Sequence, residues 1–419
     1  MDHPPAAPRL AKPNTVLAML LLVYIFNFVD RQILAILAVP IQRDLGLTDT
    51  QLGLLGGIAF ALLYSTLAVP LAALADRTSR SWVIAVSLAF WSLFTALCGL
   101  AQGFWQIFLA RLGVGVGEAG GVAPSYALIA DYFPSERRAF ALSIYSLGIP
   151  IGSAFGVLAG GYIAATIDWR TAFIVIGLAG VLVAPVFKFI VRDLPRNPQT
   201  AATAPRLTET VALLARKPSF WLLSFGAASS SMIGYGLAFW LPSLLQRSFG
   251  LDLAQTSWFI GAVLLLGGVA GMLLGGWLGD RLGKGDRAWF AWVPAIAFVL
   301  GVPLFAAGIL SESVALAFLL FLFPQAMAYV WLGPVLSAVQ HLVGGPARAT
   351  ASSLFLLINN LIGLGGGIYA LGALSDALTP IYGAEALRHS MLWSLALYLV
   401  AALLMALAGP WLRREWVSE

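Results

Sequence analysis

The sequence predicts an all-α membrane protein with twelve transmembrane helices, arranged as two six-helix bundles related by pseudo-twofold symmetry. Hydrophobic residues make up 60% of the 419 residues and charged residues only 10%, whereas a soluble domain carries about 25% charged residues. Apolar runs of about 20 residues, long enough to span a bilayer, recur along the chain. A charged signature containing Asp76 and Arg77 returns 204 residues later as Asp280 and Arg281, which indicates two tandem copies of one membrane unit.

The first copy is expected to hold six helices. Each is a long apolar run set off from the next by a short polar loop. We place these helices at residues 15–39, 51–74, 82–102, 105–130, 139–165 and 171–191. Together they form a predicted N-terminal bundle, residues 1–191.

The second copy follows the one long polar connection, residues 192–218, which contains Pro195, Pro198 and Pro205. This composition predicts a cytoplasmic linker. Its six helices are expected at residues 219–245, 255–278, 288–310, 314–342, 350–374 and 389–412. Residues 219–419 are therefore the predicted C-terminal bundle.

Loop charges predict the orientation. With the N-terminus inside the cell, 18 lysines and arginines fall in inner positions and only Arg43, Arg170, Arg247 and Arg388 in outer loops. This excess follows the positive-inside rule and predicts that both termini are cytoplasmic. The net charge of +5 lies in separate short loops, which argues against a nucleic-acid partner. The short loops and the absence of an Asn-x-Ser/Thr sequon favour a bacterial inner membrane.

Two predicted helices carry glycines at every fourth position, which places the glycines on one helix face. These residues are Gly148, Gly152, Gly156 and Gly160 in one helix and Gly267, Gly271, Gly275 and Gly279 in the other. Such faces let helix backbones approach closely in a bilayer. One interpretation is tight static packing. A shorter version recurs in a second pair of helices, as Gly53, Gly57 and Ala61 and as Gly363 and Gly367. The near-equivalent placement of these faces in the two halves favours another interpretation, a smooth contact on which the two bundles rock.

The repeated signature resembles a known family. Gly276–Lys284 is close to Gly-x-x-x-Asp-Arg-x-Gly-Arg, the loop signature of the major facilitator superfamily, and Ala72–Arg80 matches it more weakly. Arg111, Gly115 and Gly117 match a second signature of that family. The resemblance covers nearly the whole chain. It implies a secondary transporter that works by alternating access, without enzymatic activity or a cofactor, and twelve helices suffice for a monomer.

Within that superfamily the chain resembles the spinster-like branch. The resemblance rests on residues 27–32 (Asn-Phe-Val-Asp-Arg-Gln), 50–55 and 111–119. Eukaryotic members of this branch are associated with export of sphingosine phosphate and lysophospholipids. The resemblance therefore implies a small amphiphilic substrate, similar to a lysophospholipid or sphingolipid.

Four ionisable residues fall well inside predicted helices: Asp30, Arg31, Arg111 and Glu118. Charge is costly in hydrocarbon, so the default interpretation is a functional site facing a cavity, and the alternative is a structural ion pair. At about 1.5 Å per residue, Asp30 and Arg111 lie at similar depth and are expected to be partners. Glu118 lies two turns deeper, near the middle of the membrane, where such transporters bind substrate.

These depths suggest roles for the four residues. Glu118 is expected to be the main protonation site, because burial favours its neutral form and a nearby arginine its ionised form. Asp30 is expected to be a coupled second site. Arg31 and Arg111 either neutralise these acids or hold an anionic headgroup. The second half lacks a comparable charge but carries serines, tyrosines, asparagines and aromatic residues, and such a cavity suits an amphiphile.

The repeated loop signature suggests a gate. Asp76, Arg77, Asp280 and Arg281 are expected to pair with nearby loop charges or helix ends when the inner side is closed. A simpler alternative is that the arginines only set topology.

Other motifs point away from an enzyme. Residues 115–120 fit Gly-x-Gly-x-x-Gly, but they lie inside a predicted spanning helix with no preceding strand. The sequence contains no Walker, His-Glu-x-x-His or Gly-x-Ser-x-Gly motif, so we expect neither ATP, nor a metal, nor catalysis. Two rival functions stay open: a proton/drug antiporter, and a membrane scaffold or receptor without transport. The intramembrane charges argue against the second.

Overall fold

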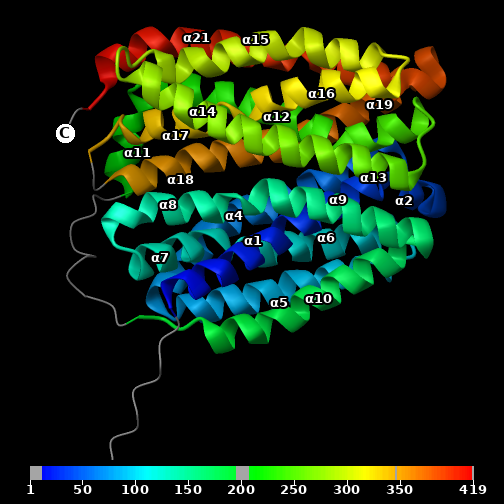
Figure 1. Ribbon diagram of the computed structural model, residues 1–419, viewed down its shortest axis with the longest axis horizontal. Coiled ribbons are helices and arrows are strands. Elements are labelled where there is room, and N and C mark those ends of the chain that lie inside the picture. The colour runs from blue at the N-terminus through cyan, green and yellow to red at the C-terminus, as the bar shows by residue number, and fades with distance from the viewer. Residues whose placement is uncertain (1–11, 195–206, 345–346, 418–419) are drawn as a thin grey trace, which may run out of the picture.

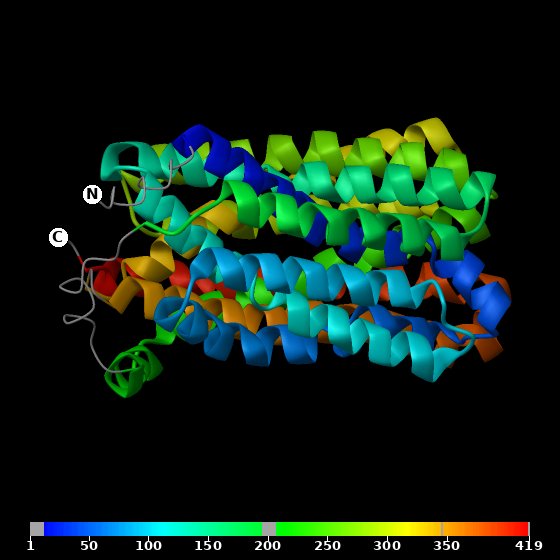
Figure 2. The ribbon, with the colours of Figure 1, turned by 90° about the horizontal axis from the view of Figure 1, so that it is seen from below.

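The computed structural model describes residues 12–194, 207–344 and 347–417. Within these ranges the chain crosses the molecule twelve times, in long helices that run side by side (Figures 1 and 2). The first helix begins at Pro13 and the last ends at Glu415. We call the end of the molecule that holds these two residues the terminal face, and the opposite end the distal face.

Six crossings form the N-terminal half. Several of them consist of two consecutive helices. Their bounds are α1 Pro13–Ile36 with α2 Ala38–Leu45, α3 Asp49–Gly56 with α4 Ile58–Arg77, α5 Arg80–Cys98, α6 Phe104–Glu118 with α7 Val122–Tyr132, α8 Ser135–Ser146 with α9 Gly148–Thr166, and α10 Trp169–Ile190.

Six further crossings form the C-terminal half. Their bounds are α12 Pro218–Arg247, α13 Leu253–Ala262 with η2 Val263–Gly267 and α14 Gly268–Gly283, α15 Trp289–Leu310, α16 Val314–Tyr329 with α17 Leu332–Gln340, α18 Arg348–Ile358 with η4 Asn359–Gly366 and α19 Gly367–Tyr382, and η5 Gly383–Glu385 with α20 Ala386–Ser394 and α21 Ala396–Glu415. A short helix, α11 (Leu207–Ala215), precedes them. It lies inside the predicted polar linker, where we expected no helix.

Ten stretches of the described chain are long and apolar enough to span a membrane. This number differs from twelve for two reasons. The predicted helix 105–130 divides into α6 and α7 at residues 119–121, so neither part reaches the necessary length. The last two crossings are joined by η5 and α20 and count as one stretch. The twelve-helix, two-bundle architecture therefore holds.

The two halves meet through α1 and α12 and along four further crossings, and each of these four is interrupted. The halves pack through α3 and α4 against α19 and η4, and through α9 against α13 and η2. In the N-terminal half, the helices break at Gly57, between α3 and α4, and at Leu147, between α8 and α9. In the C-terminal half, the interruptions η2 and η4 are π-helical segments, which occur frequently at functional sites.

These interruptions lie beside contacts between the halves. A Cβ atom built on Gly365 would lie 3.2 Å from Ala61 Cβ, and one on Gly268 would lie 3.2 Å from Pro150 Cβ. Beyond these points, towards the terminal face, α14 packs on α15, α16 and α17, and α18 packs on α11, α12 and α17.

The glycine ladders face neighbours inside their own half. A Cβ atom on Gly152 would lie 2.6 Å from the carbonyl oxygen of Ile25, and one on Gly156 would lie 2.8 Å from Val29 Cα, both in α1. The second ladder lies against α16 and α17, where Gly271 meets the backbone of Ala326. The interpretation as a contact between bundles is therefore wrong for these two long ladders, which permit tight packing within each bundle. The shorter glycine face does lie between the halves, where Gly53 meets the backbone of Ile368 and Gly57 meets that of Gly365.

Candidate transport site

Glu118, the last residue of α6, is held by α1. Its Oε2 atom accepts hydrogen bonds from Asn27 Nδ2 at 2.8 Å and from Arg31 Nε at 3.0 Å. Arg31 Nη2 lies 3.0 Å from the same oxygen. Glu118 is fully buried, whereas the Arg31 side chain keeps 12% of its surface exposed. One buried ion pair thus connects the first and fourth crossings.

Arg31 also lies against aromatic rings. Its guanidinium carbon is 5.0 Å from the ring centre of Phe28, 4.8 Å from that of Phe60 and 4.7 Å from that of Tyr64. Cation–π contacts of this kind stabilise a cation that has lost much of its water. From the C-terminal half, Tyr235 on α12 lies within electrostatic range of Arg31. Arg31 therefore lies near aromatic residues of both halves.

Arg111 is completely buried and binds the backbone rather than an acid. Its Nη1 atom donates to the carbonyl oxygen of Asp30 at 3.2 Å, and its Nε atom donates to that of Leu55 at 3.4 Å. The expected partnership with Asp30 therefore runs through the main chain of Asp30 and not through its carboxylate. Arg111 joins α6 to α1 and α3, and its positive charge remains close to both acids.

Asp30 is buried to 1% exposure. Within the described ranges, neither of its carboxylate oxygens has a hydrogen-bond partner. Trp91 and Thr95, both on α5, lie against this carboxyl group, but no hydrogen bond of normal geometry joins them to it. An ionised carboxylate in such a place costs several kcal/mol unless it is paired, so the two acids of the cluster have very different surroundings.

The C-terminal half presents neutral polar groups. Ser231 Oγ on α12 donates to Asn359 Oδ1 in η4 at 2.8 Å, and Trp240 Nε1 donates to the carbonyl oxygen of Ile368 at 2.9 Å. The bond between Ser231 and Asn359 joins two helices of the C-terminal half.

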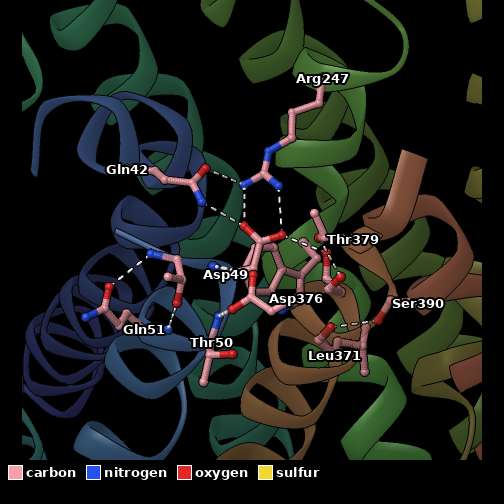
Figure 3. Close-up of polar contacts among 12 residues, drawn as sticks. Gln42, Asp49, Thr50, Gln51, Arg247, Leu371, Asp376, Thr379 and Ser390 are labelled. Carbon is pink, nitrogen blue, oxygen red and sulfur yellow. Dashed lines mark hydrogen bonds and ion pairs between the residues drawn. The ribbon is translucent and has the colours of Figure 1, made fainter. Parts of the chain in front are cut away.

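A second polar cluster joins the halves at the distal face (Figure 3). Asp49, the first residue of α3, receives two bonds from Arg247 at the end of α12, at 2.8 and 2.9 Å. Ser375 of α19 donates to the same carboxylate at 2.7 Å, and so does Gln42 at 2.8 Å. We call Gln42, Asp49, Arg247, Ser375 and Asp376 the distal lock.

Asp376 completes the distal lock at the N-terminus of α3. It accepts bonds from the backbone N–H groups of Asp49 at 3.2 Å and Thr50 at 2.7 Å (Figure 3). A carboxylate in this position satisfies donors that the helix itself leaves unpaired and complements its dipole. Sequence analysis missed this cluster. The available signal was Arg247, one of only four basic residues expected outside.

The predicted gate residues lie at the terminal face. Asp76 pairs with Arg80 at 2.9 Å, and Arg80 pairs with Asp131 at 2.5 Å, so these bonds remain inside the N-terminal half. Arg77 and Arg281 are exposed, and Arg281 lies 5.3 Å from the ring centre of Trp277. The side chain of Asp280 is outside the described residues. Their gating role remains a prediction.

Two loop acids at the terminal face are strongly hydrogen-bonded. Partial burial opposes ionisation of Asp193, but bonds from Ser79 and Ser81 outweigh it and lower the pKa of Asp193. Bonds from Arg413, at distances down to 2.5 Å, lower the pKa of Asp286 to about 2. Both carboxylates are therefore ionised near neutral pH.

Comparison with known proteins identifies the family. The model of the Major Facilitator Superfamily matches residues 20–367. This chain belongs to the major facilitator superfamily. It is 34% identical over 402 residues to an MFS-type efflux pump of Mycolicibacterium smegmatis, covering 96% of this chain and 94% of that protein. It is 30% identical over 396 residues to protein spinster homolog 1 of Mus musculus, covering 88% of this chain and 74% of that protein.

The solved structures agree with these relatives. A crystal structure of a bacterial homologue of the human lysosomal transporter Spinster, inward-facing and unoccupied, superposes with a TM-score of 0.87 at 29% identity, covering 97% of this chain and 98% of the other. The inward-facing, occupied form of that homologue superposes with a TM-score of 0.84. The chain is a multi-pass membrane transporter of the spinster-like branch, so the predicted family and fold are confirmed.

Proposed function

We propose that the protein is a proton-coupled secondary transporter that moves an amphiphilic lysophospholipid- or sphingolipid-like substrate by alternating access. It would act as a monomer in a bacterial inner membrane with both termini in the cytoplasm. The terminal face is then the inner face, and the closed distal lock corresponds to an inward-facing state. The observation that carries this proposal is the buried Arg31–Glu118 pair, in which Arg31 keeps 12% of its side chain exposed and lies near Tyr235 of the C-terminal half.

The headgroup site is proposed at Arg31. The guanidinium uses Nε and Nη2 for a single oxygen of Glu118, and the fork geometry of arginine suits phosphate or carboxylate. The rings of Phe28, Phe60 and Tyr64 around it offer an apolar surface to the adjoining part of an amphiphile. A polar head beside Arg31 and an acyl chain between the halves would match these surroundings.

Glu118 and Asp30 are proposed to carry the protons. Glu118 competes with an anionic headgroup for Arg31, so protonation of Glu118 would release Arg31 to the substrate. Asp30 has no such counter-ion in contact with its carboxylate, and burial without a partner favours its neutral form. We therefore reverse the order expected from the sequence: Asp30 holds a proton in this state, and Glu118 gains one as substrate binds.

The gate is proposed at the two ends of the molecule. The distal lock would open as the halves separate at the outer side. Asp76, Arg77, Asp280 and Arg281 would then form contacts that close the inner side. The Arg80 bonds to Asp76 and Asp131 would have to rearrange for Asp76 to take part.

The test is uptake of labelled lysophospholipid into proteoliposomes under an imposed pH gradient. We expect gradient-driven accumulation by the native protein and its loss in Glu118→Gln, whereas Glu209→Gln, an exposed acid on α11, serves as the matched control and keeps the native rate. Gradient-independent flux that survives Glu118→Gln would refute proton coupling through this residue. Absence of saturable lysophospholipid flux would refute the substrate assignment.

A second candidate is drug efflux, which is favoured by the 34% identity to an MFS-type efflux pump over nearly the whole chain. The aromatic rings around Arg31 would also suit a lipophilic drug. Transport of many unrelated cationic drugs, with no competition from lysophospholipid, would support this alternative over the first.

A further inference from the structure

An unusual group of buried polar atoms lies between α1 and α5. Both carboxylate oxygens of Asp30, the Nε1 atom of Trp91 and the Oγ1 atom of Thr95 all lack hydrogen-bond partners within the described residues. None of the three residues is more than 1% exposed. Trp91 and Thr95 are four residues apart and therefore share one face of α5, the face that lies against the Asp30 carboxyl group. Buried groups of this kind are rarely left unpaired without a reason.

Both side chains that face the Asp30 carboxyl group can donate hydrogen bonds. The indole N–H of Trp91 can only donate, and the hydroxyl of Thr95 can also donate. Two donors therefore face a carboxyl group. Donors stabilise the ionised carboxylate more than the neutral acid. The site is complementary to Asp30 after it has lost its proton, although the bonds themselves are not formed in this state.

The other charged or titratable groups around Asp30 are occupied or offer no second acid–base partner. On α6, Arg111 binds the Asp30 main chain, and Glu118 is held by Arg31 and Asn27. On α5, Cys98 lies one turn beyond Thr95 and is buried. The unpaired donors of Trp91 and Thr95 are thus the groups that can respond directly to the charge on Asp30.

We propose that Trp91 and Thr95 are positioning residues for proton exchange at Asp30, donating hydrogen bonds to its carboxylate when the proton leaves and so drawing α1 and α5 together. This inference rests on the proposed proton coupling. It also links the two acids. A Cβ atom built on Gly117 would lie 2.6 Å from Trp91 Cβ, so Trp91 packs directly on the α6 backbone at this residue. Gly117 precedes Glu118, and a movement of Trp91 towards Asp30 would therefore shift the backbone next to Glu118.

The test compares Thr95→Val, which keeps the shape but removes the donor, with Thr95→Ser, which retains the donor. Trp91→Phe removes the second donor. The readout is the pH dependence of transport in proteoliposomes. Because the lost donors stabilise the ionised form, Asp30 keeps its proton to higher pH. We expect the midpoint of the pH dependence of transport to move up by about one pH unit in Thr95→Val and in Trp91→Phe. In Thr95→Ser this midpoint should stay at the native value.

A second readout does not need transport. Infrared difference spectra of native protein and Asp30→Asn isolate the protonated-carboxyl band of Asp30, which is then titrated in each variant, with thermal melting as the check of folding. Equal titration midpoints in native protein, Thr95→Val and Trp91→Phe would overturn the inference. If the infrared midpoint moves as expected but native transport lacks pH dependence, the donors are supported and the proposed proton coupling fails.

Discussion

Removal of Arg247 should release the distal face. Arg247 makes two bonds to the Asp49 carboxylate, at 2.8 and 2.9 Å, and a third to Gln42 at 2.7 Å. Charge-assisted bonds contribute about 1.5–3 kcal/mol each, but Arg247 remains partly exposed and Asp49 keeps its bond from Ser375. A net loss of about 2 kcal/mol is reasonable, and at about 1.4 kcal/mol per factor of ten it shifts the closed–open equilibrium about 30-fold.

The assay measures accessibility from the outer side. Cys98 is the only cysteine, so Ile368→Cys in a Cys98→Ala background gives one reporter, which is nearly buried on α19. Its labelling rate with a charged maleimide should rise about 30-fold in Arg247→Ala, in proportion to the open fraction. Arg43→Ala is the matched control, because Arg43 is exposed on the same face. A labelling rate in Arg247→Ala that stays within twofold of the rates in the native protein and in Arg43→Ala would refute the reasoning.

Two further predictions concern stability. Gly156→Ala should lower the free energy of unfolding by about 1–3 kcal/mol, because its methyl group would overlap the Val29 backbone. Gly276→Ala should be neutral, because no atom lies within 4 Å of the new methyl group. Equal melting temperatures of the two variants would contradict this prediction. The pKa of Asp286, held at about 2 by Arg413, predicts stability that is complete above the unfolded value of about 3.9 and is lost as pH falls towards 2. Asp286→Asn should remove this part of the acid dependence, as followed by unfolding at a series of pH values.

The fold was largely readable because the bilayer imposes length and composition on each crossing. The helix at 105–130 is the exception, since its break at residues 119–121 lies in a long apolar run, although Gly120 and Gly121 directly after Glu118 are a glycine signal that could have marked it. The α11 helix was missed for the opposite reason. Its nine residues are too few to stand out against a proline-rich segment, although its packing on α12 and α18 supports it.

The site was only partly readable. The cost of charge in hydrocarbon identified Asp30, Arg31, Arg111 and Glu118, but depth alone could not pair them. Asp30 and Arg31 differ by about 100° around the helix axis, and that rotation decides that Arg31, not Asp30, meets an ionic partner. The distal lock was harder still, because Asp49 and Asp376 are 327 residues apart. The glycine ladders failed similarly: periodicity defines a face but not the neighbour that covers it.

The helix interruptions give the inner segments the properties of levers. From Gly268, beside Pro150, α14 continues for 15 residues to Gly283, an arm of about 22 Å. A tilt of about 10° at that contact would carry the far end through about 4 Å while the contact itself hardly moved. A small tilt of α14 against α9 would therefore be magnified at the terminal face. A membrane protein built this way needs no large rearrangement of its buried charges to change which side of the bilayer they can reach.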